Sequence, residues 1–367
     1  MLLTSISTLG LSQRLNGSMT GLQIDLARVN DELASGKHYD VAGRLGARTG
    51  QAISLRQLHE RSEEYLKTTT LLDSRMALMG SAMAEMDTVA SDVFALAVAG
   101  ATEPAQTGMA LQVKARGALD LMAGLLNTSD GSRQLFSGVD IDVPALRQIA
   151  GDDSGMPSPL QMVRDAISAA LGGPAVPATA AESASAAAAL DDFFAVRPDG
   201  TPVPPPLAYE YEGGMFLGTK ALDAGGAPNP RVAGMPEDAN EVPYGIQAND
   251  PFVRDMMQGL FMLAAIDTHA LAPDAYQPYM EAALAKLDGG LGGLRAASAD
   301  LGVQQASIAR VEQRHTARMK VLNEQINALE DVDPYETSVR LNQIEAQLEA
   351  AMNATARVSR LRLTDYL

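Results

Sequence analysis

The side chains that could carry out chemistry are few and widely spaced in this sequence. Metal centres and acid–base catalysis often use histidine, because a neutral imidazole binds metals well and titrates near neutral pH. None of the four histidines has another within a helical turn: His38, His59, His269 and His315. The chain has no cysteine, which excludes disulfides, thiolate catalysis and cysteine-ligated metals. We therefore expect exposed or interfacial histidines rather than a metal site.

Four methionines form a cluster of soft ligands: Met76, Met79, Met83 and Met86. Thioether sulfurs can bind soft metals, and methionine-rich surfaces can bind peptides. The same spacing also matches the a and d positions of a coiled coil, where methionine serves as a core residue. We favour the core interpretation, because the pattern continues on both sides of the methionines.

Two further clusters resemble binding loops only in composition. The aspartates between Asp140 and Asp153 lack the calcium-loop spacing with its central glycine and final glutamate. The glycines between Gly289 and Gly293 lack the lysine and the preceding strand of a phosphate-binding loop. No serine–histidine–aspartate, paired-carboxylate or cofactor motif is recognisable. We predict no catalytic residue, no metal site and no cofactor, and we do not expect an enzyme.

A long helical seam is the dominant pattern of the sequence. From Leu55 to Ala97, alternating steps of three and four residues land mainly on Leu, Met, Tyr, Val and Ala. This is the a/d pattern of a coiled coil, so the segment is expected to pack against other helices. The seam positions are Leu55, Leu58, Ser62, Tyr65, Thr69, Leu72, Met76, Met79, Met83, Met86, Ala90, Val93 and Ala97.

Both ends of the chain carry apolar stripes at helical spacing. An isolated helix with one such stripe needs neighbours to cover it, so we predict that these stripes form an assembly interface. An ordinary bundle within one chain is the alternative. The candidate residues are Leu11, Leu15, Leu22, Leu26, Val29, Leu33, Leu341, Ile344, Leu348, Val358, Leu361, Leu363 and Leu367.

Local signals mark the ends of the predicted helices. The first helix should stop at Ser35-Gly36, where glycine can adopt a left-handed conformation, and an irregular connection should follow from Asp40 to Gly50. The last helix should begin at Asp333-Pro334 with a capping box completed by Glu336. Between these ends, helices are predicted over 109–127, 251–267 and 276–329, and the last could break or bend at its glycines.

The middle of the chain differs from its ends. Of 19 prolines, 15 lie between Pro144 and Pro251, and residues 139–250 hold 16 acidic and 5 basic residues, a net charge of −11. We predict a small acidic, mixed domain here, with polyproline at 202–206 and an alanine-rich helix at 180–196. A hairpin is expected from strands 207–211 and 215–219.

We therefore predict a mainly α fold with long antiparallel coiled-coil arms from both termini and a small mixed α/β or β-rich insert. The predicted domains are an N-terminal assembly helix, two parts of a helical rod that flank an outward-facing insert, and a C-terminal assembly helix. Their boundaries are 1–40, 41–138, 139–250, 251–333 and 334–367, with the insert at 139–250.

Charge and hydropathy limit the partners. The net charge of −17 argues against nucleic acid, because phosphate binding needs a basic surface. No apolar run approaches the ~18 residues of a membrane span, and the N-terminus lacks the basic region of a cleaved secretory signal. We expect either a cytosolic protein or one exported with its N-terminus intact.

Five motifs resemble the flagellin superfamily in combination. Segments 33–37 and 43–53 resemble the end of the first flagellin helix and its following loop. Segment 330–335 resembles the turn before the last flagellin helix. Segment 134–138, Gln-Leu-Phe-Ser-Gly, and the terminus 362–367 are similar to those of the hook–filament junction proteins called hook-associated protein 3. The continuation His38-Tyr39-Asp40 departs from the family pattern.

The resemblance implies a structural junction protein of the bacterial flagellum that connects hook to filament and templates flagellin polymerisation. It implies self-association in a ring or tube, with a neighbouring hook-associated protein and flagellin as partners. An export chaperone is expected at the C-terminal helix, and type III export would carry the protein to the extracellular flagellum without a cleaved signal peptide. Residues 1–40 and 335–367 are expected to be disordered before assembly. A filament flagellin subunit and a cytosolic coiled-coil scaffold are the alternatives.

Overall fold

The chain divides into two compact units, which are described separately. Unit 1 consists of Met1–Glu64 and Arg314–Leu367, and unit 2 of Tyr65–Gln313. The structure, a computed structural model, describes residues 8–102, 104–152, 154–173, 175–238 and 240–364. It is 70% helical, with a small middle region that contains strands, which confirms the predicted fold class.

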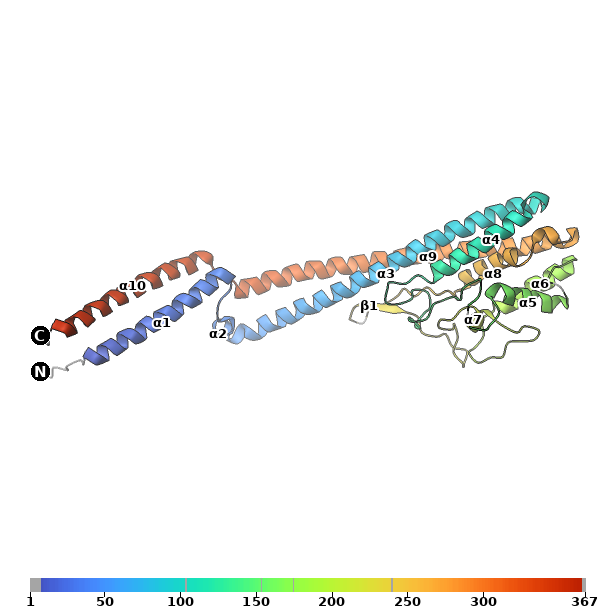
Figure 1. Ribbon diagram of the computed structural model, residues 1–367. Coiled ribbons are helices and arrows are strands. Elements are labelled where there is room, and N and C mark those ends of the chain that lie inside the picture. The colour runs from blue at the N-terminus through green and yellow to red at the C-terminus, as the bar shows by residue number, and fades with distance from the viewer. Residues whose placement is uncertain (1–7, 103, 153, 174, 239, 365–367) are drawn as a thin grey trace. The chain divides into compact units, whose positions relative to one another are not determined.

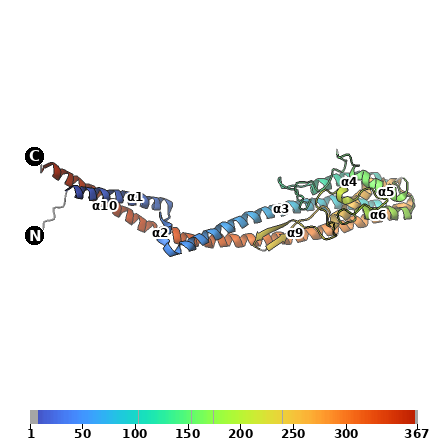
Figure 2. The same ribbon diagram turned by 90° about the horizontal axis from the view of Figure 1, so that it is seen from below.

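Unit 1 is built around its two terminal helices. Helices α1 (Thr8–Ser35) and α10 (Pro334–Thr364) lie side by side and run in opposite directions (Figures 1 and 2). At one level of the pair, Thr355 Oγ1 lies 3.4 Å from Met19 Sδ. The described parts of the chain ends are helical, whereas disorder before assembly was expected for residues 1–40 and 335–367; of these, residues 1–7 and 365–367 lie outside the described residues.

Both predicted helix ends in unit 1 are confirmed. Gly36 follows α1 with a φ of +72°, a left-handed conformation that side-chain-bearing residues rarely adopt. Asp333 caps α10, since its Oδ1 accepts hydrogen bonds from the backbone N–H groups of Tyr335 at 2.8 Å and Glu336 at 3.4 Å. The end of α1 and the start of α10 therefore follow from local chemistry.

The connection between α1 and the next long helix is more ordered than predicted. It contains the short helix α2 (Val41–Leu45) and the 3₁₀ turn η1 (Gly46–Arg48), followed by α3 (Thr49–Thr102), which continues into unit 2. Asp40 caps α2 by accepting a 2.8 Å hydrogen bond from the Gly43 N–H. A Cβ at residue 43 would lie 2.2 Å from Asp40 Oδ2, so this cap requires glycine there.

Unit 2 is a helical core with an irregular, strand-containing insert. Its other helices are α4 (Pro104–Leu126), α5 (Pro159–Leu171), α6 (Ala180–Phe193), the single turn α7 (Tyr211–Gly214), α8 (Pro251–Ala265), the 3₁₀ turn η2 (Thr268–Ala270) and the first part of α9 (Pro273–Glu330). The rest of α9 belongs to unit 1. The predicted helices over 180–196, 251–267 and 276–329 are confirmed, whereas α4 begins earlier than residue 109.

The α3 seam forms part of the unit 2 core. Met76, Met79, Met83 and Met86 are fully buried in one hydrophobic cluster, which confirms their interpretation as a core stripe. Leu58, at an earlier seam position on the unit 1 part of α3, is exposed.

Helix α9 runs unbroken through its glycine cluster, so the break that the glycines allowed does not occur. A Cβ at Gly290 would lie 2.7 Å from the Met256 backbone N, and one at Gly293 would lie 2.4 Å from Phe252 Cβ. These two glycines therefore let α8 approach α9 closely. Packing against α8 offsets the low helix propensity of the cluster.

The predicted hairpin at 207–219 is wrong. Residues around Tyr211 form the turn α7 instead, and the consecutive residues 214–216 are all buried rather than alternating between a buried and an exposed face. The observed hairpin joins β1 (Ala233–Glu237) to β2 (Asn240–Pro243), antiparallel, with Ala233 opposite Pro243. A Cβ at Gly234 would lie 2.4 Å from Leu72 Cδ1, so β1 lies directly against α3.

Helix α5 was not predicted, although its boundary signals are present in the sequence. The hydroxyl of Ser158 accepts a hydrogen bond from the Gln161 N–H, and Pro159 occupies the first helical position. Gly172 ends the helix with a φ of +66°. Together these three residues mark both ends of a helix.

Candidate assembly interface

Several of the predicted assembly residues whose side chains are described lie where α1 and α10 pack together. Val29 is 0% exposed and Ile344 is 8% exposed, so the two stripes meet within one chain. The other described positions are only partly covered, and Leu33 is exposed. The half-buried members are Leu15, Leu22, Leu26, Leu341 and Leu348. Leu11, Val358, Leu361 and Leu363 belong to helices whose side chains are not described there, and Leu367 lies outside the described residues.

A pair of helices can cover only one side of each apolar side chain in its seam. Full burial of a leucine stabilises a fold by about 1.5–3 kcal/mol, and a half-buried leucine realises only part of that. The half-covered leucines of α1 and α10 would gain this remainder if further helices packed on the pair. Pairing of α1 with α10 within one chain therefore covers part of the apolar stripes, and the remaining apolar surface is available for association.

Apolar side chains outside the predicted set extend this surface. Tyr335 is 80% exposed, and Ile24, Val339 and Met352 are also exposed. Tyr335 and Val339 are four residues apart on α10, so they lie on one face. The four-residue spacing is visible in the sequence, but the prediction followed the stronger apolar stripe through Leu341 and did not include these two residues.

A buried carboxylate joins the segments at the base of the helix pair. The Glu330 side chain is 0% exposed and accepts hydrogen bonds from Lys37 Nζ at 3.1 Å and Arg56 Nε at 2.7 Å. The backbone is also tied, since the His38 N–H donates to the Glu330 carbonyl at 2.9 Å. The Arg56 guanidinium and, after it, the Lys37 ammonium lower the pKa of Glu330 despite its burial. The partners are hundreds of positions apart in sequence, so no local pattern revealed this site.

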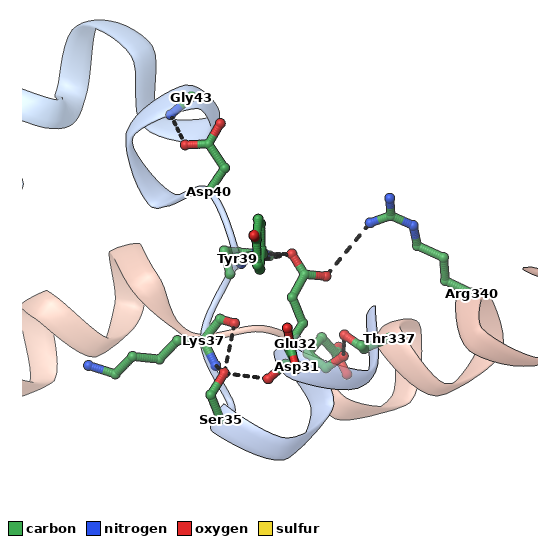
Figure 3. A network of polar contacts seen from close by, with 11 residues as sticks. Asp31, Glu32, Ser35, Lys37, Tyr39, Asp40, Gly43, Thr337 and Arg340 are labelled. Carbon is green, nitrogen blue, oxygen red and sulfur yellow. Dashed lines mark hydrogen bonds and ion pairs between the residues drawn. The ribbon is translucent and has the colours of Figure 1, made fainter. Parts of the chain in front are cut away.

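Glu32 forms a second polar centre, between α1, the connection and α10 (Figure 3). Its Oε1 accepts a 3.0 Å hydrogen bond from the Tyr39 N–H and lies 3.7 Å from His38 Nδ1. Its Oε2 lies 3.8 Å from Arg340 Nη1 on α10. The residues His38 and Tyr39, which depart from the family pattern, therefore take part in fixing the connection to both terminal helices.

A polar cleft of about 530 Å³ opens beside Glu32. It is lined by Asp25, Arg28, Glu32, His38, Tyr39, Asp40, Arg44 and Arg340. The guanidinium of Arg28 lies 5.6 Å from the centre of the Tyr39 ring, a cation–π geometry. The lining is mainly charged and aromatic, which suits recognition of a charged group.

The described residues contain neither a metal cluster nor a membrane helix. No three histidine, aspartate or glutamate side chains gather closely enough there to hold a metal ion. None of the described helices combines the length and apolar character that a bilayer span requires.

The chain thus belongs to a class of helical proteins whose terminal helices pair with each other and are separated in the sequence by a strand-containing middle region. Two family models match the chain, the bacterial flagellin N-terminal helical region over residues 6–140 and the bacterial flagellin C-terminal helical region over residues 284–367. Together they take in more than half of the chain, which therefore belongs to the flagellin superfamily. A comparison with curated proteins found no match.

Membership makes the protein a structural component of the flagellum. The family is structural rather than enzymatic, and it implies self-assembly into flagellar polymers outside the cell. The half-covered seam of α1 and α10 is consistent with such assembly.

Proposed function

We propose that the protein is a junction protein that connects the flagellar hook to the filament and templates flagellin polymerisation. The observation that carries the proposal is the segment 134–138, Gln-Leu-Phe-Ser-Gly, which resembles hook-associated protein 3. The C-terminal segment 362–367 supports it through the same resemblance.

The junction-like segment has a structural role in unit 2. Phe136 and Ser137 are buried, and the Phe136 carbonyl accepts a 2.8 Å hydrogen bond from the Ala248 N–H. Gly138 has a φ of +80°, and a Cβ there would lie 2.7 Å from Gln247 Nε2. The segment thus joins the first and last residues of the insert, so its sequence is under tight structural constraint.

In this proposal the chain associates with copies of itself in a ring or tube. The segments 1–40 and 334–367 would form the inner contacts through the leucine stripes, and the insert 139–250 would face outward. Neighbouring partners would be another hook-associated protein and flagellin, and an export chaperone would bind the C-terminal helix. Export would proceed without a cleaved signal peptide.

Deletion of the gene tests the proposal, with cells observed by electron microscopy and flagellin measured in the medium. Bare hooks with flagellin shed as monomer are the expected result, and the intact gene on a plasmid should restore filaments. Fully filamented cells would contradict both a junction protein and a filament subunit.

A filament flagellin subunit is the second candidate, because the matching models are those of flagellin itself. It predicts missing or thinned filaments without shed flagellin, and thousands of copies per filament rather than one ring. A cytosolic scaffold, the most distant alternative, would be excluded by finding the intact chain in sheared external appendages.

A further inference from the structure

The polar cleft beside Glu32 contains one cation whose charge no other described residue neutralises. Arg28 lies 3.7 Å from Asp25, and Arg340 lies 3.8 Å from Glu32. Arg44, on α2, is exposed, and its side chain makes no hydrogen bond or ion pair with the described part of the chain. The lining acids are already engaged within the cleft, so a new anionic group would meet Arg44.

The cleft also presents an aromatic surface beside this cation. Tyr39 is 60% exposed and stands at the cleft with Arg28 against its ring. Figure 3 shows Tyr39 between the Asp40 cap of α2 and Glu32 on α1. The Asp40 cap and the Tyr39 N–H bond to Glu32 hold the connecting segment, and with it Arg44 and Tyr39, in place. The occupant should therefore combine a carboxylate with a small apolar group.

One flank of α10 offers that combination. Glu345, Glu349 and Met352 follow one another at helical spacing, so they share a face. All three are exposed, and neither glutamate side chain makes an ion pair or hydrogen bond with the described residues. None of the three lines the cleft of its own chain. Methionine sulfur packs favourably on aromatic rings, and a carboxylate pairs with a guanidinium.

We propose that the cleft binds the α10 flank of a second copy of this chain, with Glu345 and Glu349 facing Arg44 and Met352 facing Tyr39. The two contact surfaces differ, so each copy offers one of each and the contact can continue into a ring or a helical array. Exposed ion pairs add little affinity but strongly penalise wrong pairings, so the contact sets the register of neighbours. The inference rests on the self-assembly of the proposed function and adds the residues that select the neighbour.

Charge exchange tests the proposal with the full chain in a sedimentation assay of assembly. We expect Arg44→Glu, and separately the pair Glu345→Lys with Glu349→Lys, to raise the concentration needed for assembly about tenfold. Combining all three substitutions should restore assembly. The matched controls are Arg318→Glu and the pair Gln343→Lys with Gln347→Lys, which are exposed in unit 1 but outside the proposed contact. Circular dichroism should show the same helix content in every variant.

A proximity measurement keeps the test independent of charge. Because the chain has no cysteine, single substitutions Tyr39→Cys and Met352→Cys can be made in separate preparations, mixed, assembled and oxidised. We expect disulfide-linked dimers from this mixture and few from Tyr39→Cys mixed with Gln343→Cys. Normal assembly without these dimers, or without any effect of Arg44→Glu, overturns the proposed contact and leaves self-assembly intact. Failure of the unaltered chain to assemble overturns both.

Discussion

The carboxylate of Glu330 and the guanidinium of Arg56 form a close ion pair, with Arg56 Nη2 2.6 Å from Glu330 Oε1. Glu330 ends α9, whereas Arg56 lies near the start of α3, and Lys37 adds a second cation from the segment after α1. The pair therefore ties together segments from both halves of the sequence. Its carboxylate is fully buried, and its cations remain about half exposed.

Replacing Glu330 should destabilise unit 1. The substitution Glu330→Gln removes the charge that Arg56 and Lys37 neutralise, with almost no change in volume. Loss of one partner of a buried pair can cost about 3–5 kcal/mol, but these cations can rehydrate, so we expect about 1–3 kcal/mol. Urea unfolding measures the difference. Glu324→Gln, an exposed acid on the same helix, is the control and should change little.

The Glu330 site also predicts a pH dependence. Its pKa is lowered from 4.5 in the folded chain, so its contribution to stability is present above pH 4.5 and is lost as the pH falls through the folded pKa. The difference in unfolding free energy between the wild type and Glu330→Gln should therefore shrink on acidification from about pH 7 to about pH 3. A difference that stays constant with pH would show that the carboxylate charge has no role.

Glu212 should behave in the opposite way. It is buried, and within the described structure neither its Oε2 nor the nearby Asn249 Oδ1 has a hydrogen-bond partner. Burial raises the pKa of Glu212, against the hydrogen bond from Asn249 and the nearby Arg254 and Lys220 charges, which lower it. The contribution of Glu212 to folding stability is thus fully present below pH 4.5 and is lost as the pH rises through the folded pKa.

The substitution Glu212→Gln should consequently stabilise unit 2 at neutral pH. The glutamine amide carries no charge to bury and can donate a hydrogen bond to Asn249. We therefore expect the free energy of unfolding to rise by about 1–2 kcal/mol. Thermal unfolding at several pH values measures it, and the stabilisation should vanish towards acidic pH. Glu241→Gln, an exposed glutamate of the same unit, serves as the control. Destabilisation at neutral pH would mean that the ionised carboxylate is needed.

The glycine cluster of α9 offers a matched pair of substitutions. A Cβ at Gly290 would overlap the Met256 backbone on α8, so Gly290→Ala should destabilise by about 1–3 kcal/mol. A Cβ at Gly292 would meet nothing within 4 Å, so Gly292→Ala should stabilise by up to about 1 kcal/mol through helix propensity. Denaturant unfolding of both variants measures the two changes in unfolding free energy. Equal effects would contradict the close packing of α8 on α9.

Removal of residues 358–367 should abolish assembly while leaving the core of unit 2 folded. These residues include predicted interface positions such as Val358 and Leu361, whereas the unit 2 core contains none of them. Sedimentation measures assembly, and calorimetry measures the unfolding of unit 2. A lower unfolding temperature of unit 2, or normal assembly, would count against this division of roles.

Local patterns were enough to predict much of the fold. The periodicity that places Met76 and Met83 in a core depends only on the spacing of apolar residues along one helix. The helix ends at Gly36 and Asp333 follow from backbone chemistry within a few residues. The helical arms and the apolar stripes of the terminal helices are therefore determined by residue types and spacing along the chain.

Only tertiary structure decided which surfaces meet. Glu330 looks like any surface acid in the sequence, and its burial depends on cations that other segments bring to it. Gly290 looks like a helix breaker until α8 lies against it. The predicted hairpin at 207–219 does not form, because the residues around Tyr211 are buried without alternation. The hairpin lies at 233–243 instead. These features arise from contacts between distant segments, which local spacing does not encode.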